Sequence, residues 1–436
     1  MIVGAMKNVL KNKVANNALW FIFGKAAQSL LAFLVGIFTA RYLGPSNYGI
    51  INYASSIVAF VVPIMNLGFN NVLVQELTIQ PEEEGKIIGT SVLLSFFSSL
   101  ACIIGVSSYT FIVDAGEKTT NIVVILYSIM LVFQAFELIQ YWFQAKLLSK
   151  QISIVSFVGY LFVSVYKVIL LISNASVFWF AISNSIDYFL IAVALLVIYR
   201  KMGGQRLSFS KATAKRLFSG SKHYILSSLM VTIFAQTDKI MIKLMISEES
   251  VGFYSAAATC SGITAFIFAA IIDSFRPMIF QYKKDGQIVL YEKTIARLYC
   301  IIIYLSLLQS VFITIFARFL IDVVYGKEYL SAASTLQIIV WYSTFSYMGA
   351  VRNIWILGEQ KQKFLWILNL GGAVLNIGLN GWFIPLWGIN GAAAASLITQ
   401  IFTNVFMNII VWPLKHNNAL IIKGLNPMLI IKLFKD

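Results

Sequence analysis

The sequence predicts an all-α polytopic membrane protein, and three observations support this class. Hydrophobic residues make up 59% of the 436 residues and charged residues only 12%, which is far from the composition of water-soluble domains. Apolar runs of about 20 residues, the length that crosses a bilayer as a helix, follow one another along almost the whole chain. Basic residues are concentrated in alternate gaps between these runs. A water-soluble fold is therefore excluded.

About twelve apolar runs are the predicted transmembrane helices. They cover residues 16–40, 48–70, 88–112, 121–145, 152–173, 176–199, 223–246, 251–275, 296–321, 331–357, 364–384 and 389–413. Each run is long enough to cross a hydrocarbon core of about 30 Å at 1.5 Å per residue. The longest polar stretch between runs, 200–222, separates six of them from the other six.

The distribution of basic residues predicts the orientation. One set of alternate gaps holds only four of the 33 basic residues, Arg41, Lys118, Arg318 and Lys327, and most of the others lie in the second set and at the two termini. By the positive-inside rule the richer set faces the cytoplasm. We therefore expect a multi-pass protein of the bacterial cytoplasmic membrane with both termini cytoplasmic. The net charge of +15 follows from this rule and from attraction to membrane lipids, and it requires no nucleic-acid partner.

The two halves echo each other in the turn after their first helix. Gly49 and Gly252 fall at matching positions, although a coincidental glycine turn is the alternative. Because each half has an even number of runs, both begin on the same side, so the repeat is parallel with a pseudo-twofold axis along the membrane normal. The predicted domains are an N-terminal lobe (1–199), a basic cytoplasmic linker (200–222), a C-terminal lobe (223–413) and a cytoplasmic amphipathic tail (414–436).

Three motifs resemble those of polysaccharide flippases in the multidrug/oligosaccharidyl-lipid/polysaccharide exporter superfamily. They are Arg41-Tyr42-Leu43-Gly44-Pro45-Ser46-Asn47-Tyr48-Gly49; Thr237-Asp238-Lys239-Ile240-Met241-Ile242 with Val251-Gly252-Phe253-Tyr254; and Asn376-Ile377-Gly378-Leu379-Asn380 with Ile384-Pro385, Gly388-Ile389 and Gly391-Ala392-Ala393-Ala394-Ala395. The resemblance covers essentially the whole chain. It implies two six-helix lobes that form a V around a central cavity. It also implies movement of a polyprenyl-diphosphate-linked repeat unit, of the O-antigen, capsule or teichoic type, to the outer leaflet.

Ionisable residues inside the apolar runs are candidates for the transport path, because a charge at the centre of a spanning helix costs about 2.5–3.5 kcal/mol. They are Lys25, Glu137, Lys167, Asp187, Asp238 and Lys239, with Lys243 nearer the outer end. Lys167 and Asp187 lie at similar depth on consecutive helices, which favours a structural ion pair. Glu137, Asp187 and Asp238 are the carboxylates that can either carry a coupling H⁺ or Na⁺ or form ion pairs.

The cations are predicted to bind the diphosphate of the substrate. Lys25 is expected to line the cavity, and Lys239 and Lys243, four residues apart, share a helix face that suits a polyanion. In the alternative, Lys243 extends to the outer headgroups and Lys239 pairs with a carboxylate such as Glu137. Arg276 and Arg352, at inner helix ends, are candidates for the cavity entrance, with ordinary positive-inside anchoring as the alternative.

A polar stripe is predicted on the eleventh run. Asn369, Asn376 and Asn380 recur at spacings of seven and four, so they share one helix face. Amides lining a path for sugars are one interpretation. Packing between helices through small and polar residues is the other.

Three classes of function compete. A flippase for lipid-linked oligosaccharides, with polysaccharide assembly proteins as partners, is favoured by the motifs and the lysines. A cation-coupled multidrug antiporter of the same superfamily is the alternative, although the first run carries Lys25 and no acid. A membrane glycosyltransferase would need clustered acids or bases on a large outer loop, and the gaps are too short for one. We therefore predict no enzyme, no catalytic residues, no metal site and no cofactor beyond a coupling H⁺ or Na⁺.

Overall fold

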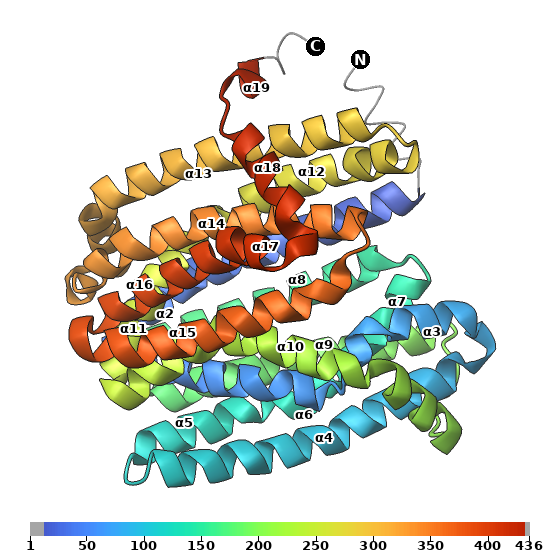
Figure 1. Cartoon of the computed structure of the whole chain (residues 1–436). Helices are drawn as coiled ribbons and strands as arrows, with labels where there is room; N and C mark the ends of the chain where they lie inside the picture. Colours follow the sequence, from blue (N-terminus) through green and yellow to red (C-terminus); the bar gives the residue numbers. More distant parts are fainter. Residues whose placement is uncertain (1–12, 432–436) are drawn as a thin grey trace. The chain divides into compact units, whose positions relative to one another are not determined.

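The computed structural model describes the backbone of residues 13–431 and the side chains of residues 27–429. Within this part of the chain all regular secondary structure is helical (Figure 1), so the predicted all-α class is confirmed. The helices form two compact units. The first comprises Met1–Leu43 and Ile50–Thr232, and the second comprises Gly44–Gly49 and Ile233–Asp436.

The first unit is built from two long hairpins and shorter connecting helices. Its helices are α2 (Lys13–Met65), α3 (Leu73–Ile79), α4 (Glu84–Val113), α5 (Lys118–Ser128), α6 (Met130–Gln134), α7 (Gln140–Ala145), α8 (Ser149–Ile172), α9 (Val177–Lys201) and the beginning of α10 (Lys211–Met245), with 3₁₀ turns η1 (Phe69–Asn71), η2 (Pro81–Glu83) and η3 (Ala135–Ile139). Helices α8 and α9 pack against each other, as do α4 and α5.

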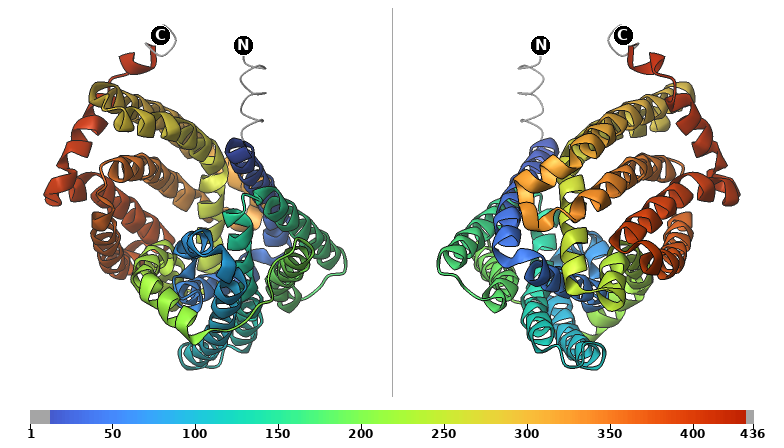
Figure 2. Two further views of the ribbon diagram at one scale, coloured as in Figure 1. Left: turned by 90° about the vertical axis from the view of Figure 1, so that its right-hand side faces the viewer. Right: turned by 90° about the vertical axis from the view of Figure 1, so that its left-hand side faces the viewer.

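The second unit contains the end of α10 and all later helices. These are α11 (Glu248–Ser261), α12 (Ala265–Lys284), α13 (Ile288–Tyr325), α14 (Ala332–Gly358), α15 (Leu365–Trp387), α16 (Ile389–Ile401), α17 (Met407–Ile410), α18 (Lys415–Gly424) and α19 (Met428–Ile431), with 3₁₀ turns η4 (Gly262–Thr264), η5 (Lys327–Tyr329), η6 (Gln362–Phe364) and η8 (Trp412–Leu414) and the π-helical turn η7 (Phe402–Phe406). Figure 2 shows α13 and α14 side by side, and α14 also packs against α11 and α16.

Ten of the described helical stretches are long and apolar enough to cross a membrane. One of them, α2, loses helical geometry at Gly44, where φ is 69° and ψ is 171°. It covers the predicted run 16–40 and most of the run 48–70, since it ends at Met65. Helix α14, with 27 residues, coincides with the predicted run 331–357 without being one of the ten. The protein is therefore multi-pass, and the number of twelve crossings stays a prediction.

Each unit has its own hydrophobic core. In the first unit the largest buried side chains include Phe69, Phe143 and Tyr199. In the second unit they include Phe268 and Trp355.

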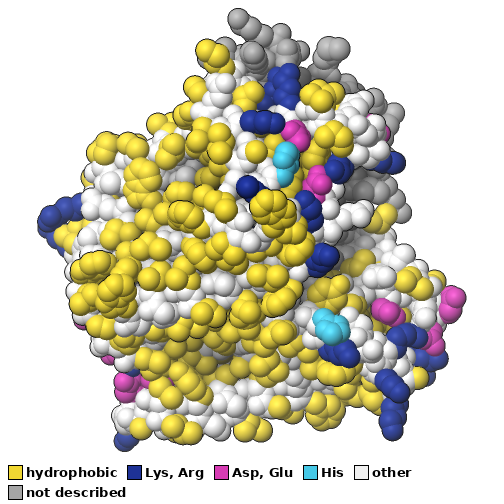
Figure 3. Space-filling model, viewed as in Figure 1, with side chains coloured by type: hydrophobic (Ala, Val, Ile, Leu, Met, Phe, Trp, Pro, Cys, Tyr) yellow, Lys and Arg dark blue, Asp and Glu magenta, His cyan; other side chains and the backbone are white. Residues whose placement is uncertain are grey.

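Much of the remaining apolar surface is exposed, as lipid-facing helices require. Ile104, Ile112 and Phe97 on α4 and Leu308 and Ile315 on α13 are each 59–78% exposed. In Figure 3 hydrophobic side chains cover the visible face over α15 and α16, whereas Lys and Arg gather near α18. A contiguous apolar surface of this kind is unfavourable in water and favourable in contact with lipid.

The predicted linker, 200–222, is held against the first unit. The backbone N–H of Ser208 donates to the carbonyl of Gly85 at 3.1 Å. Gly85 and Gly89 on α4 permit this approach, because a Cβ on either would overlap the backbone of Arg206 or Ser208. The first part of the linker therefore lies on α4.

The second part of the linker is the beginning of α10. Its Arg216 forms ion pairs with Glu76 of α3 at 3.0 Å and with Glu83 of η2 at 3.2 Å. The first turns of α10 are thus fixed to the first unit, and the change of unit falls between Thr232 and Ile233 inside the helix.

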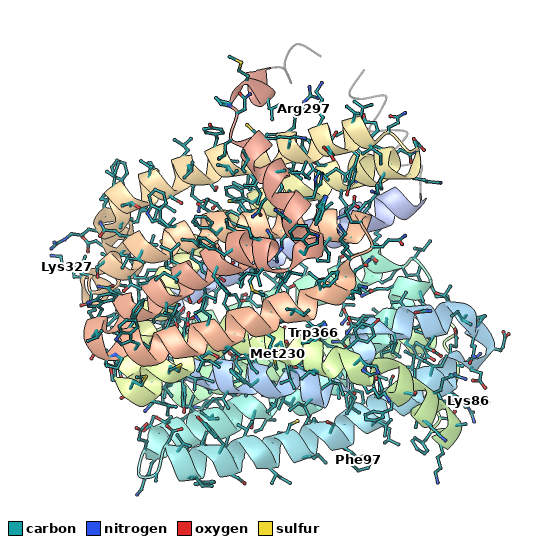
Figure 4. The ribbon with its side chains drawn as sticks, in the orientation of Figure 1. Lys86, Phe97, Met230, Arg297, Lys327 and Trp366 are labelled. Carbon is teal, nitrogen blue, oxygen red and sulfur yellow. The ribbon has the colours of Figure 1, made fainter. Side chains whose placement is uncertain are left out.

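The tail packs on the outside of α13. The Tyr299 hydroxyl donates to Asn417 Oδ1 at 2.9 Å, and the Tyr304 hydroxyl donates to the carbonyl of Leu425 at 2.8 Å. Gly424 allows α18 to approach closely, because a Cβ there would lie 2.6 Å from Cβ of Tyr299. In Figure 4, Arg297 near the beginning of α13 and Lys327 in the turn after it mark opposite ends of this helix.

Candidate functional site

A buried carboxylate, Asp238 of α10, lies at the centre of the candidate site in the second unit. Its side chain is 7% exposed. Oδ1 accepts a hydrogen bond from Asn380 Nδ2 of α15 at 2.7 Å. Oδ2 accepts hydrogen bonds from the hydroxyls of Tyr254 on α11 and Ser396 on α16. Four helices therefore converge on one carboxylate.

A second layer of hydrogen bonds orders these donors. Asn376 Nδ2 donates to Ser396 Oγ at 3.2 Å, and Asn380 Nδ2 also donates to Asn376 Oδ1 at 3.0 Å. Asn376 and Asn380 are one helical turn apart and fully buried. Their amides consequently point in the same direction, toward α10 and α16.

Local sequence explains why these helices meet. Gly388 adopts φ of 59° between α15 and α16, a conformation that suits glycine. Gly391 then lies against the backbone of Phe383, where a Cβ would overlap the carbonyl. The resulting tight hairpin brings Asn380 and Ser396 to the same depth, beside Asp238.

The electrostatics of this site are unusual for a buried carboxylate. None of the ion pairs of the described residues involves Asp238, and the donors that it does have are neutral. The neighbouring Lys239 interacts with it electrostatically but is half-buried and points away, since adjacent helical residues diverge by about 100°. Asn380 Oδ1 is buried and has no protein partner. Several oxygens around one negative charge form a set that can hold a proton or a small hard cation.

The other predicted cavity cations lie elsewhere. Lys243, only 7% exposed, forms an ion pair with Glu248 at 3.6 Å. Arg276 is exposed and pairs with Asp273, one turn away, at 2.9 Å. Arg352 is buried in α14. Lys25 lies outside the side chains that the structure describes. The binding of a diphosphate by these residues stays a prediction.

The two carboxylates predicted in the first unit have separate surroundings. Asp187 of α9 is 9% exposed, packs beside Gly159 of α8, and interacts electrostatically with Lys167 of α8. Within the described part of the chain the two groups form no direct ion pair. Glu137 lies half-buried in η3, near Tyr141. The structure therefore brings neither carboxylate into the Asp238 cluster.

The predicted asparagine stripe on α15 divides into two parts. Asn376 and Asn380 belong to the Asp238 cluster, whereas Asn369, two turns earlier, is half-buried and outside it. Tyr254 and Ser396 are members that sequence reasoning missed. Tyr and Ser are common in helices, so neither residue stands out in the sequence. The one sequence signal for the cluster was the i, i+4 spacing of the two asparagines, together with a carboxylate in an apolar run.

The helical bundle and its apolar surface define an all-α multi-pass membrane protein. The chain belongs to the family described as "Polysaccharide biosynthesis protein", whose model matches residues 14–283. The predicted membership in the flippase superfamily is thereby confirmed.

Two of the curated relatives are similar over nearly their whole length. The chain is 22% identical over 408 residues to a protein of Shigella flexneri named "Putative O-antigen transporter", covering 89% of this chain and 95% of the relative. It is 20% identical over 385 residues to the "Capsular polysaccharide biosynthesis protein CapF" of Staphylococcus aureus, covering 86% and 93%.

Solved structures share the fold. The lipid II flippase MurJ in an inward closed conformation has a TM-score of 0.71 at 14% identity, covering 96% of this chain and 93% of that chain. An inward-facing multidrug resistance transporter of the MATE family has a TM-score of 0.68 at 13% identity, covering 89% and 96%. At these identities the likeness establishes the fold alone.

Proposed function

We propose that the protein is a flippase that moves a polyprenyl-diphosphate-linked oligosaccharide, a polysaccharide repeat unit, from the inner to the outer leaflet. One observation carries this proposal. The relatives named "Putative O-antigen transporter" and "Capsular polysaccharide biosynthesis protein CapF" match over 93–95% of their own length. The multidrug antiporter is the weaker candidate, because its support is likeness of fold at 13% identity.

The physical problem of this transport is the head group. A diphosphate carries roughly two negative charges, which hydrocarbon solvates very poorly. A path between the two halves that is wet and lined by cations solves it, while the polyprenyl tail stays in lipid. Lys25 and Lys239 are the lysines that we assign to this path. Lysine attracts phosphate as a mobile point charge, whereas arginine would hold it in a rigid fork.

Coupling is assigned to Asp238. A membrane-buried carboxylate held by neutral donors gains most from binding a positive ion, since no protein cation forms an ion pair with it among the described residues. We propose that H⁺ or Na⁺ binds there and that its arrival and release bias the two halves between inward- and outward-open arrangements. The site lies wholly within the second unit, so binding can change the packing of α10 against α15 and α16.

The same proposal includes the topology. Both termini, the linker and the tail lie in the cytoplasm of a bacterium, the membrane is the cytoplasmic membrane, and polysaccharide assembly proteins receive the product at the outer face. The basic character of the linker and tail supports this orientation.

Complementation tests the function. A strain that lacks its own repeat-unit flippase should regain surface polysaccharide with the wild-type chain and with Lys327→Ala, whose side chain is exposed in η5. It should not regain it with the double variant Lys25→Ala, Lys239→Ala or with Asp238→Asn, at equal protein levels. Normal polysaccharide from the double variant would remove the lysines from the path. Drug resistance without polysaccharide would favour the antiporter.

A further inference from the structure

A line of buried polar residues runs along α16 and α17, away from Asp238. Ser396, Gln400, Asn404 and Asn408 follow one another at spacings of four, and their exposed fractions range from 0 to 6%. Burying four polar side chains in one row of a membrane protein costs free energy unless they are hydrogen-bonded, and such a row often has a role in function.

The π-helical turn η7 keeps this row on one face. In a regular α-helix a residue twelve positions further on is rotated by about 120°. A π-bulge adds one residue to a turn, so the rotation between Ser396 and Asn408 falls to about 20°. Because η7 lies between these two residues, the irregular turn brings Asn408 back under Ser396.

Hydrogen bonds tie the row to Asp238 at one end and to α18 at the other, and among the described residues Ser396 and Gln400 are not hydrogen-bonded to each other. Ser396 donates to Asp238 at one end. In the middle, the Asn404 side chain donates to Gln400 Oε1. Toward the other end, Asn408 Nδ2 donates to the carbonyl of Asn404 at 2.7 Å and to Asn418 Oδ1 of α18 at 3.0 Å. Helix α18 lies at the end of the unit where basic side chains gather, which is the predicted cytoplasmic end (Figure 3).

Arg352 of α14 lies against this row. Nη1 donates to the carbonyl of Thr403 at 2.6 Å, and Nη2 donates to Asn353 Oδ1 at 3.3 Å. The side chain is 6% exposed, and none of the ion pairs of the described residues includes it. Its Nε has no partner. One turn earlier, Gly349 lies against Asn404 Oδ1, where a Cβ would overlap that atom.

Buried polar atoms without a protein partner occur along this row as well as elsewhere in the described structure. Asn380 Oδ1, Arg352 Nε and Asn408 Oδ1 are all buried without a protein partner, at the Asp238 end, the middle and the far end of the row. Buried polar groups nearly always find a partner, from the protein or from ordered water. Three such atoms spaced along one line are therefore suited to contact water or an ion moving past them.

We infer that the row Ser396–Gln400–Asn404–Asn408 is the route by which the coupling cation passes between Asp238 and the cytoplasm, and that Arg352 is a fixed charge that keeps this route closed to uncoupled ions. The inference rests on the proposed function and deepens it. Amide and hydroxyl oxygens replace the hydration of Na⁺ or hold the waters that carry a proton, and a fixed arginine opposes cations as in other selective pores. The cation then enters and leaves inside one unit, separately from the glycan.

Ion flux through proteoliposomes without any lipid-linked glycan tests the charge. H⁺ and Na⁺ fluxes are measured separately, with a pH dye and with radioactive Na⁺. If a cation passes Arg352 at about 5 Å with an effective dielectric constant of about 20, Arg352→Gln should raise the leak on the order of 100-fold. Arg318→Gln, an exposed arginine on α13, should leave it unchanged. Arg352→Lys keeps the positive charge, so its cation leak should stay as low as that of the wild type. An equal leak from Arg352→Lys and Arg352→Gln would overturn the role of charge.

Variants that narrow the row test the route. In the Arg352→Gln background, where the leak is large, Asn404→Leu and Gly349→Ala should lower cation flux at least 10-fold. Asn390→Leu, at the other end of α16, should not lower it. The cation-dependent shift in melting temperature reports binding at Asp238 separately and should survive in Asn404→Leu. If this shift is lost in Asp238→Asn while Asn404→Leu and Gly349→Ala leave the leak of Arg352→Gln unchanged, the route is wrong and the coupling site stands. If Asp238→Asn keeps the shift, the coupling site itself is wrong.

Discussion

The repeat glycines provide the sharpest steric prediction. Gly49 and Gly252 occupy matching positions in the two halves, and the second unit brings their segments into contact. A Cβ on Gly49 would overlap the carbonyl of Glu248, and a Cβ on Gly252 would overlap the carbonyl of Pro45. Both obstructing groups are backbone, so neither can turn away as a side chain would. We expect Gly49→Ala to destabilise the second unit.

The size of the effect follows from two opposing contributions. Alanine in place of a helical glycine normally stabilises by about 0.5–1 kcal/mol, because the unfolded chain loses freedom. Forcing an extra carbon into a packed contact costs about 1–3 kcal/mol, and a rigid backbone neighbour favours the upper part of that range. The net change for Gly49→Ala is therefore a loss of about 1–2 kcal/mol, or a few degrees in melting temperature.

Thermal unfolding of the purified protein in detergent measures this change. Gly36→Ala and Gly378→Ala are matched controls in helices, since a Cβ at either position meets no other group within 4 Å, and each should melt at or slightly above the wild type. Gly49→Ala and Gly252→Ala relieve the same contact once it has opened, so the double variant should lose less than the sum of the single losses. A Gly49→Ala protein as stable as Gly36→Ala would refute the steric reasoning.

Two further predictions concern the linker and the topology. Arg216→Gln removes the ion pairs with Glu76 and Glu83 that fix the beginning of α10, so residues 211–220 should exchange amide hydrogens faster than in the wild type. Lys215→Gln should leave that exchange unchanged. Equal protection of residues 211–220 in both variants would show that the ion pairs do not hold the helix. The topology is tested with single cysteines in a background without Cys102, Cys260 and Cys300. Lys327→Cys should react with a membrane-impermeant maleimide on intact cells, and Lys150→Cys should react only after permeabilisation. The reverse pattern would contradict the proposed topology.

The fold class was predictable because a helix that crosses a bilayer must be about 20 residues long and mostly apolar. Length and hydropathy alone located nearly every long helix, and Gly44-Pro45 located the break in α2. The lengths were less predictable. Helix α13 extends over 38 residues, about 57 Å, well beyond its apolar run of 296–321. Its early turns contain Glu292 and Lys293, which hydropathy assigns to a loop but which a helix tolerates outside hydrocarbon.

The candidate site was predictable only in its central residue. Asp238 is conspicuous in sequence because a carboxylate in an apolar run requires an explanation. Tyr254 and Ser396 are not conspicuous, because hydroxyls are common in helices and their contact with Asp238 spans 16 and 158 residues of sequence. The pairing of Lys243 with Glu248 across a turn was equally hidden, since the sequence alone did not show that the loop folds back.

Counting charges along the sequence also misses how this protein holds two of the deeply buried charged residues of its second unit, Asp238 and Arg352. Asp238 is held by neutral hydroxyl and amide donors, and Arg352 is held by a carbonyl and an amide. From the seven residues between Ser396 and Thr403, the two charges are about 10 Å apart along the helix axis. Their attraction at an effective dielectric constant of about 20 is then about 1.7 kcal/mol, which is less than the several kcal/mol that burying each charge costs. Packing alone would favour apolar residues at both positions.

The double variant Asp238→Leu, Arg352→Met should therefore melt at or above the wild-type temperature while losing cation-dependent shifts and complementation. Such a variant separates stability from transport, because it removes both charges without leaving either one alone in the membrane. If the double variant fails to fold or melts well below the wild type, the two charged groups are needed for stability. Neither the coupling site nor the cation route would then be needed to explain them.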